Sequence, residues 1–102
     1  MKAFARLPKT EESRVIGKQM LRSGTSVGAQ YREARRARSD AESLSKITSA
    51  HQELEETTYW LELLVRCEIV PKSLLGDLLQ EADELGAIFT SIVLRLKERL
   101  GR

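Results

Sequence analysis

The feature that most constrains the fold of this chain is the spacing of apolar residues over residues 40–100. Intervals of three and four residues alternate there, which places side chains along one face of an α-helix. One series comprises Leu44, Ile47, His51, Leu54, Thr58, Leu61 and Val65. The next comprises Leu75, Leu78, Ala82, Leu85, Phe89, Ile92 and Leu96. Two long series of this kind predict an all-α protein whose helices pack along apolar seams.

Residues that favour helix ends divide the chain further. They are Pro8, Thr10, Ser39, Glu42, Pro71 and Gly101. Ser39 and Glu42 have the spacing of a capping box, and Gly101 suits the residue after a last turn. The small residues from Ser23 to Ala29 could form a loop, but a continuous helix is favoured, because small residues also let a neighbouring helix approach closely. We therefore predict three long helices, at about residues 10–38, 40–68 and 71–100.

The size and composition of the chain limit its class. With 102 residues it is expected to form a single domain, residues 1–102, with a modest core. No stretch approaches the roughly 20 apolar residues that span a bilayer, and the first residues do not form a secretion signal. Cys67 is the only cysteine, which excludes an intrachain disulfide, and we interpret it as packed and unreactive. These features predict a cytoplasmic protein without membrane contact.

Charged residues are segregated along the chain. Residues 1–51 hold eleven Lys and Arg against five Asp and Glu, a net charge of +6. Residues 52–102 hold six against ten, a net charge of −4, and the halves sum to the +2 of the whole chain. The first half is therefore a candidate surface for a polyanion. The second is a candidate surface for a basic partner, including another copy of the chain.

The densest basic cluster lies near the predicted end of the first helix. Two interpretations remain open, because cations there compensate the helix dipole and guanidinium groups also bind phosphate. Basic residues at helical spacing earlier on the same helix extend the cluster into a stripe and favour phosphate binding to RNA or DNA. The candidate nucleic-acid-binding residues are Arg14, Lys18, Arg22, Arg32, Arg35, Arg36 and Arg38.

Polar residues near the apolar seams suggest other roles. Four of them are predicted to form a buried polar layer that fixes helix register, with Arg22 or Arg32 as partners for the carboxylates. This set is Ser23, Ser26, Glu33 and Glu55. His51, the only histidine, is one helical turn from Glu55 and could supply half of a metal site, but a polar pair is the preferred interpretation. No pattern typical of catalysis is present, so we predict a non-enzymatic protein without cofactor or metal.

Several stretches resemble a family of bacterial helical proteins related to those encoded in intervening sequences of large-subunit (23S) ribosomal RNA genes. The most specific stretch is LRSGTSVGAQYREA at residues 21–34, followed by RARS at residues 36–39. Agreement extends to ELEETTYWLELL at residues 53–64 and EADEL at residues 81–85, and the resemblance covers about residues 12–98. One departure is Gln30, where the family usually has Asn.

The resemblance implies an antiparallel up-and-down four-helix bundle that assembles as a ring-like homopentamer. Family members normally begin with a long first helix, and only Met1–Leu7 stands in its place, so the first helix is expected to be short or truncated. The resemblance also implies kinship with the basic accessory protein of diversity-generating retroelements, which works with a reverse transcriptase and nucleic acid. It carries over no catalytic residue.

Two functions are consistent with these observations. The arginine cluster favours a non-enzymatic, oligomeric adaptor that binds RNA or DNA through a basic surface. The acidic second half favours the alternative, a protein-binding scaffold for a nucleic-acid enzyme such as a reverse transcriptase, with no nucleic-acid contact of its own.

Overall fold

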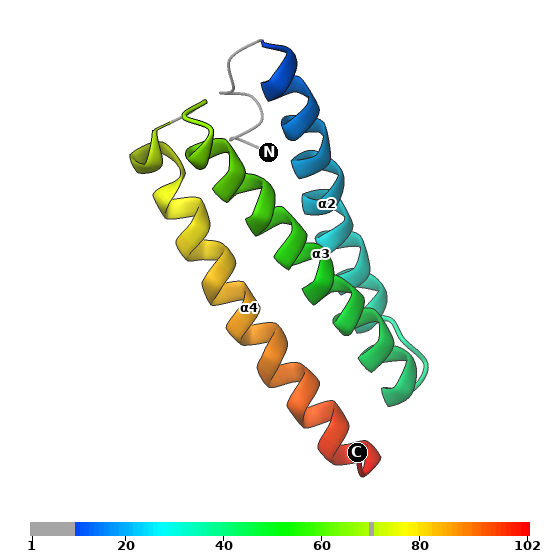
Figure 1. Cartoon of the computed structure of the whole chain (residues 1–102). Helices are drawn as coiled ribbons and strands as arrows, with labels where there is room; N and C mark the ends of the chain where they lie inside the picture. Colours follow the sequence, from blue (N-terminus) through cyan, green and yellow to red (C-terminus); the bar gives the residue numbers. More distant parts are fainter. Residues whose placement is uncertain (1–9, 70) are drawn as a thin grey trace.

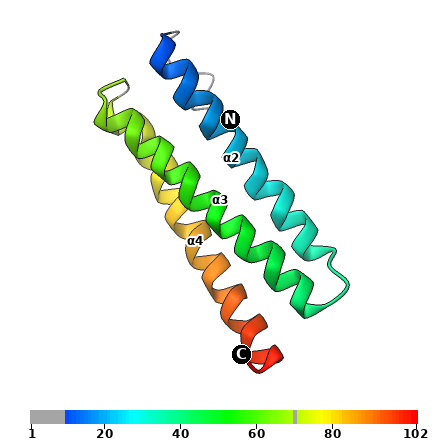
Figure 2. The same ribbon diagram turned by 45° about the vertical axis from the view of Figure 1, so that its right-hand side comes forward.

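The protein is an elongated layer of three antiparallel helices. A computed structural model describes residues 10–69 and 71–102, except for the side chains of residues 74 and 75. Its helices are α2 (Glu11–Arg35), α3 (Asp40–Arg66) and α4 (Lys72–Leu100). α3 lies in the middle and packs against both α2 and α4 (Figures 1 and 2). The molecule measures 48 × 20 × 17 Å.

The predicted all-α class is confirmed, but the predicted four-helix bundle is wrong. The part of the chain that the structure describes contains three helices, and its two outer helices both pack on α3. A four-helix bundle would need a further helix in contact with both α2 and α4. The short first helix expected at residues 1–7 lies outside the described residues, as do the side chains of Leu74 and of Leu75 in the second predicted seam.

Short capping motifs mark the starts of α2 and α3 and the end of α4 close to the predicted positions. At the start of α2, the N–H of Ser13 donates to Oγ1 of Thr10 at 3.2 Å, and the N–H of Thr10 donates to Oγ of Ser13 at 3.1 Å. Ser39 caps α3 by accepting from the N–H of Glu42 at 3.1 Å. Gly101 ends α4 in the left-handed conformation, with φ of 71°, which glycine adopts without strain.

The first helix ends three residues earlier than predicted. The N–H of Arg36 donates to the carbonyls of Arg32 and Glu33, both at 3.2 Å, so the last turn tightens after Arg35. This tightening releases the chain in time for Ser39 to cap α3. The small residues of α2 do not interrupt the helix, as predicted from the sequence.

In the described part of the chain, two apolar clusters form the core, one at each end of the layer. The larger cluster contains Val27, Ala34, Leu44, Ile47, Ala50, Leu54, Phe89 and Leu96. The smaller contains Ile16, Met20, Leu61 and Leu64. Ser23 and Thr57, both buried, lie in sequence between the residues of the two clusters. Most residues of the predicted seams are therefore buried or half-buried, and the packing of three helices rests on them.

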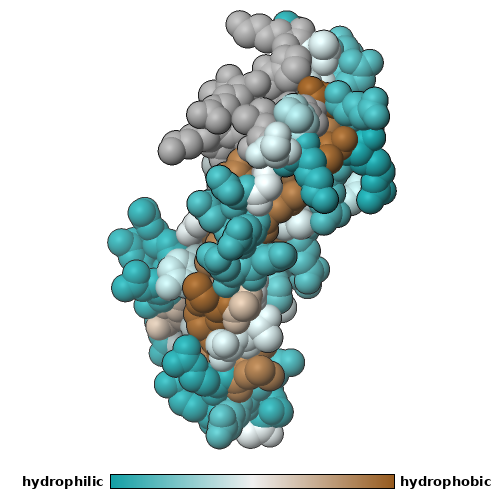
Figure 3. Space-filling model, turned by 90° about the vertical axis from the view of Figure 1, so that its left-hand side faces the viewer, coloured by the Kyte–Doolittle hydropathy of each residue, from teal (hydrophilic) through white to brown (hydrophobic). Residues whose placement is uncertain are grey.

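Apolar residues also remain on the surface. Figure 3 shows them as a discontinuous band along the long axis, with hydrophilic residues on both sides. Among the residues that the structure describes, four large apolar side chains are more than half exposed, namely Val15, Tyr59, Ile88 and Leu94. Within residues 10–69 and 71–102, no helix combines the length and the apolar character that crossing a bilayer requires.

Candidate functional site

The end of α2 and the connection to α3 carry four arginines on one end of the molecule. Arg32 and Arg35 belong to the last turn of α2, and Arg36 and Arg38 follow in the connection. All four are exposed, and none forms an ion pair with another described residue. Their charges are therefore available to an anion from solution.

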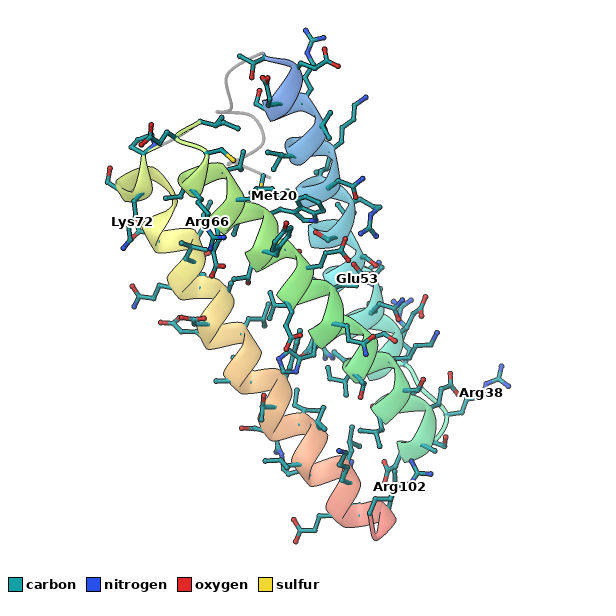
Figure 4. All side chains as sticks on the ribbon, viewed as in Figure 1. Met20, Arg38, Glu53, Arg66, Lys72 and Arg102 are labelled. Atoms are coloured by element: carbon teal, nitrogen blue, oxygen red, sulfur yellow. The ribbon has the colours of Figure 1, made fainter. Side chains whose placement is uncertain are left out.

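The end of α4 adds further cations to the same region. Figure 4 shows Arg38 and Arg102 at one end of the molecule, with Arg66 and Lys72 at the other. Nη2 of Arg99 lies 3.3 Å from Oδ1 of Asp40, which ties the end of α4 to the start of α3. We call this region the basic end; its exposed cations are Arg32, Arg35, Arg36, Arg38, Arg95, Lys97, Arg99 and Arg102.

Sequence reasoning missed Arg95, Lys97 and Arg99 near the end of α4 and Arg102 just after it, because the second half of the chain is acidic as a whole. The signal that could have found them is helix length. The three helices have 25, 27 and 29 residues and short connections, so the ends of α2 and α4 must lie at the same end of the layer.

The other three candidate residues are placed differently. Arg14 and Lys18 are exposed on α2 but lie about 27 Å and about 21 Å from Arg32 along the helix axis, at 1.5 Å per residue. Arg22 forms an ion pair with Glu56, and its Nη1 lies 3.6 Å from Oε2 of Glu53. The structure thus gathers Arg32, Arg35, Arg36 and Arg38, and it does not bring Arg14, Lys18 or Arg22 to them.

The guanidinium group of Arg22 contacts two carboxylates of α3, those of Glu53 and Glu56, in addition to solvent. Its hydrogen bond lowers the pKa of the Glu56 carboxyl, and the indole N–H of Trp60, which lies 3.4 Å from the same oxygen, acts in the same direction. The same hydrogen bond raises the pKa of Arg22. Because both partners stay charged, this pair links α2 to α3 and reduces the phosphate-binding capacity of Arg22.

The predicted buried polar layer is partly wrong. Ser23 is fully buried and Ser26 is half-buried, but Glu33 and Glu55 are exposed on the described chain. Glu33 forms an ion pair of 2.9 Å with Nζ of Lys46, and Glu55 lies 3.8 Å from Nε2 of His51. Carboxylates on the margin of a helical apolar face can turn outward to water, and this avoids the free energy of burying a charge.

The buried polar contact is made by hydroxyl groups instead. Oγ1 of Thr57 lies 2.8 Å from Oγ of Ser23, and Ser23 donates to the carbonyl of Met20 at 3.2 Å. Sequence reasoning missed Thr57, although it lies three residues after the seam residue Leu54. Two turns after Ser23 on α2, Oε1 of Gln30 is buried without a hydrogen-bond partner in the described structure.

His51 and Cys67 do not form a reactive centre with other described residues. In that part of the chain, no three His, Cys, Asp or Glu side chains gather in an arrangement that could hold a metal ion. The rings of His51 and Phe89 form a T-shaped contact, with centroids 6.2 Å apart and planes at 70°. The interpretation of Cys67 as packed is wrong, because its side chain is exposed just after the end of α3.

Two hollows border the arginines of α2. The larger, of about 980 Å³, lies where the second half of α2 faces the start of α3, and Glu42 and Lys46 contribute to its lining. The smaller, of about 510 Å³, is lined by Tyr31 and Arg35. Gly28, Arg32 and Arg36 line both hollows. The ion pair with Glu33 raises the pKa of Lys46, so this lysine stays charged at the edge of the larger hollow.

Fold and site together define a small helical protein with a basic end. Residues 1–91 match the family model described as 23S rRNA-intervening sequence protein. The chain belongs to this family, as its resemblance predicted.

A solved structure supports the same placement. It is a crystal structure, at 1.70 Å resolution, of a protein of unknown function from the S23 ribosomal protein family of Bacteroides thetaiotaomicron VPI-5482. That protein is 42% identical to this chain, and the match covers 78% of this chain and 73% of that one with a TM-score of 0.75. Comparison with curated proteins gives no match.

Proposed function

We propose that this protein is a non-enzymatic, oligomeric adaptor that binds RNA or DNA through its basic end. The observation that carries the proposal is the group of four exposed arginines, Arg32, Arg35, Arg36 and Arg38, without ion pairs among the described residues. Exposed guanidinium groups bind phosphates in pairs of hydrogen bonds and release counterions from nucleic acid.

Compensation of the helix dipole accounts for only part of this cluster. The dipole effect is confined to the last turn of a helix, where Arg32 and Arg35 lie. Arg38 lies beyond the end of α2, next to the residue that caps α3, where a helix N-terminus favours anions and not cations. A phosphate bound at this point would be favoured by Arg38 and by the N-terminus of α3.

The proposal is tested by binding measurements on two variants that lose the same charge. Arg36→Ala/Arg38→Ala removes two cations from the basic end, and Arg66→Ala/Lys72→Ala removes two exposed cations from the other end. Affinity for a labelled RNA is measured at several salt concentrations. We expect the first variant to bind more weakly, with a log–log salt slope smaller by about 1.4 if both contacts are to a single strand.

The matched variant is expected to stay close to the unmodified protein in affinity and in salt slope. Equal losses in the two variants would indicate attraction by net charge alone. Unchanged binding by Arg36→Ala/Arg38→Ala would reject the basic end as the site.

Self-association is the second part of the proposal, with another copy of the chain as the partner. An apolar groove of about 200 Å³ runs between α2 and α4 over α3, with Val27, Leu54, Leu61, Leu78, Ala82 and Leu85 in its lining. Glu81 also lines it, and Asp77, Asp83 and Glu84 are exposed on the same helix. A second copy offers charges of the opposite sign on α2, including Arg14 and Lys18. The family resemblance favours five copies in a ring.

Light scattering after size-exclusion chromatography tests this association. Ile88 is 53% exposed on α4, so Ile88→Glu is expected to keep the fold and to lower the mass of the assembly. Tyr59 is equally exposed on α3, at 54%, and Tyr59→Glu is the matched control, because Tyr59 does not line the groove. A monomer in the unmodified protein would reject self-association and favour a scaffold that binds a different protein.

A further inference from the structure

The two hollows beside α2 share part of their lining, namely Gly28, Arg32 and Arg36. Gly28 lines both hollows, and a Cβ atom built on Gly28 would meet nothing within 4 Å. Thr25, one turn before Gly28, and Ala29, the next residue, are also small and exposed, whereas Tyr31 and Arg32 follow one turn after Gly28. An elongated ligand could therefore pass from one hollow to the other over Gly28 and lie close to the helix backbone.

The charges around this path favour an anion along its whole length. The larger hollow has four cations and two carboxylates in its lining, which leaves a net charge of +2; these are Arg32, Arg36, Arg38 and Lys46 against Glu33 and Glu42. One of the carboxylates, Glu33, is already paired with Lys46 at 2.9 Å. The smaller hollow has three arginines and no carboxylate in its lining.

The smaller hollow also contains an aromatic ring. Tyr31 lines it and stacks on Phe89, with centroids 5.7 Å apart and planes at 22°, so the core fixes the orientation of the Tyr31 ring. A basic groove with an aromatic ring is the combination that binds single-stranded nucleic acid, because every base has a face that can stack. A rigid duplex would rest on the arginine side chains, whereas a flexible single strand can bend into a hollow.

We propose that one single strand of nucleic acid crosses α2 at Gly28, with its phosphates on Arg32 and Arg36 and a base at Tyr31. This inference rests on the proposed function and adds the path and the class of ligand. The volumes of the two hollows, about 980 Å³ and about 510 Å³, lie in the range of roughly 300–1,000 Å³ that is usual for small-ligand sites.

Gly28→Leu tests the path without changing any charge. Leucine is a good helix former, and the space beside Gly28 is open, so the variant is expected to be at least as stable as the unmodified protein. Its side chain would block the crossing, and we expect affinity for a labelled oligouridylate of about 16 nucleotides to fall roughly tenfold or more. Gly76→Leu is the matched control, since a Cβ atom at Gly76 of α4 also meets nothing within 4 Å.

Three ligands and one further variant separate the outcomes. The single-stranded RNA, a DNA of the same length and an RNA duplex are compared, and the duplex is expected to bind most weakly. Tyr31→Leu is expected to reduce affinity for single strands roughly tenfold while leaving the salt slope unchanged, because stacking involves no counterion release. Thermal unfolding of each variant is recorded to verify that it is folded.

Two results would overturn the path. If Gly28→Leu binds single strands as well as Gly76→Leu does, while Arg36→Ala/Arg38→Ala binds them weakly, the basic end binds nucleic acid by another route. If Gly28→Leu lowers the mass of the assembly and leaves binding unchanged, the face around Gly28 is a contact between copies. If every variant, including Arg36→Ala/Arg38→Ala, binds as well as the unmodified protein, the proposed function itself is rejected.

Discussion

The rings of Tyr31 and Phe89 stack at a centroid distance of 5.7 Å and join the two outer helices of the layer. Phe89 is only 1% exposed and belongs to α4, whereas Tyr31 belongs to α2 and lines the smaller hollow. One aromatic pair therefore connects the core to the candidate site. Its loss would loosen the contact of α2 with α4, because both helices otherwise pack mainly on α3.

Phe89→Ala is predicted to destabilise the protein by about 3–5 kcal/mol, since it removes a buried ring and leaves a cavity. This is a large share of the roughly 5–15 kcal/mol expected for a whole domain. Phe89→Leu keeps most of the volume and is expected to cost much less. A double-mutant cycle with Tyr31→Leu, measured by urea unfolding, is expected to give a coupling of about 0.5–1.5 kcal/mol. Additive effects would show that the ring contact contributes nothing of its own.

Thr57→Val is predicted to destabilise the protein by about 1–2 kcal/mol, although valine has nearly the same shape. Oγ1 of Thr57 lies 2.8 Å from both Oγ of Ser23 and the carbonyl of Glu53, so its single proton serves one acceptor at a time. Thr57→Ser keeps the hydroxyl and is the control, with a smaller expected effect. Combining Thr57→Val with Ser23→Ala is expected to cost less than the sum, because each single substitution already removes the hydrogen bond between the two hydroxyls.

The helices were predictable from the sequence because their signals are local. The alternation of three- and four-residue intervals locates α3 and α4. Thr10 and Ser39 cap the starts of α2 and α3 where predicted, and Gly101 caps the end of α4. The sequence could not predict which polar side chains near the seams are buried and which are exposed to solvent. Glu33 and Glu55 are near the seam by spacing, yet each lies just far enough around its helix to reach solvent.

The candidate site was only half predictable for a different reason. Arg32, Arg35, Arg36 and Arg38 are close in sequence, so their clustering is visible without a fold. Arg99 reaches the same end only because three helices of similar length reverse direction twice, which is a property of the topology. The role of Arg22 was likewise hidden, since its partners Glu53 and Glu56 are more than thirty residues away.

Glu56→Gln is predicted to destabilise the protein at neutral pH and to have less effect in acid. Arg22 lowers the pKa of Glu56 in the folded chain below the unfolded value of about 4.3. The stabilisation is therefore fully present above the unfolded pKa and is lost as the pH falls through the folded pKa. Urea unfolding of both proteins from pH 7 to pH 3 should show their free energies of unfolding converging. A difference that does not depend on pH would contradict the ion pair as its cause.

Glu33→Gln is predicted to strengthen binding of single-stranded RNA. Glu33 holds Nζ of Lys46 at 2.9 Å, so its replacement removes a carboxylate from the larger hollow and releases a cation toward a phosphate. One additional phosphate contact should steepen the log–log salt slope by about 0.7 for a single strand. Glu62→Gln makes the same change of net charge near the other end of α3, where Glu62 is exposed, and is expected to alter binding little. Equal gains in the two variants would mean that net charge, and not the released lysine, is responsible.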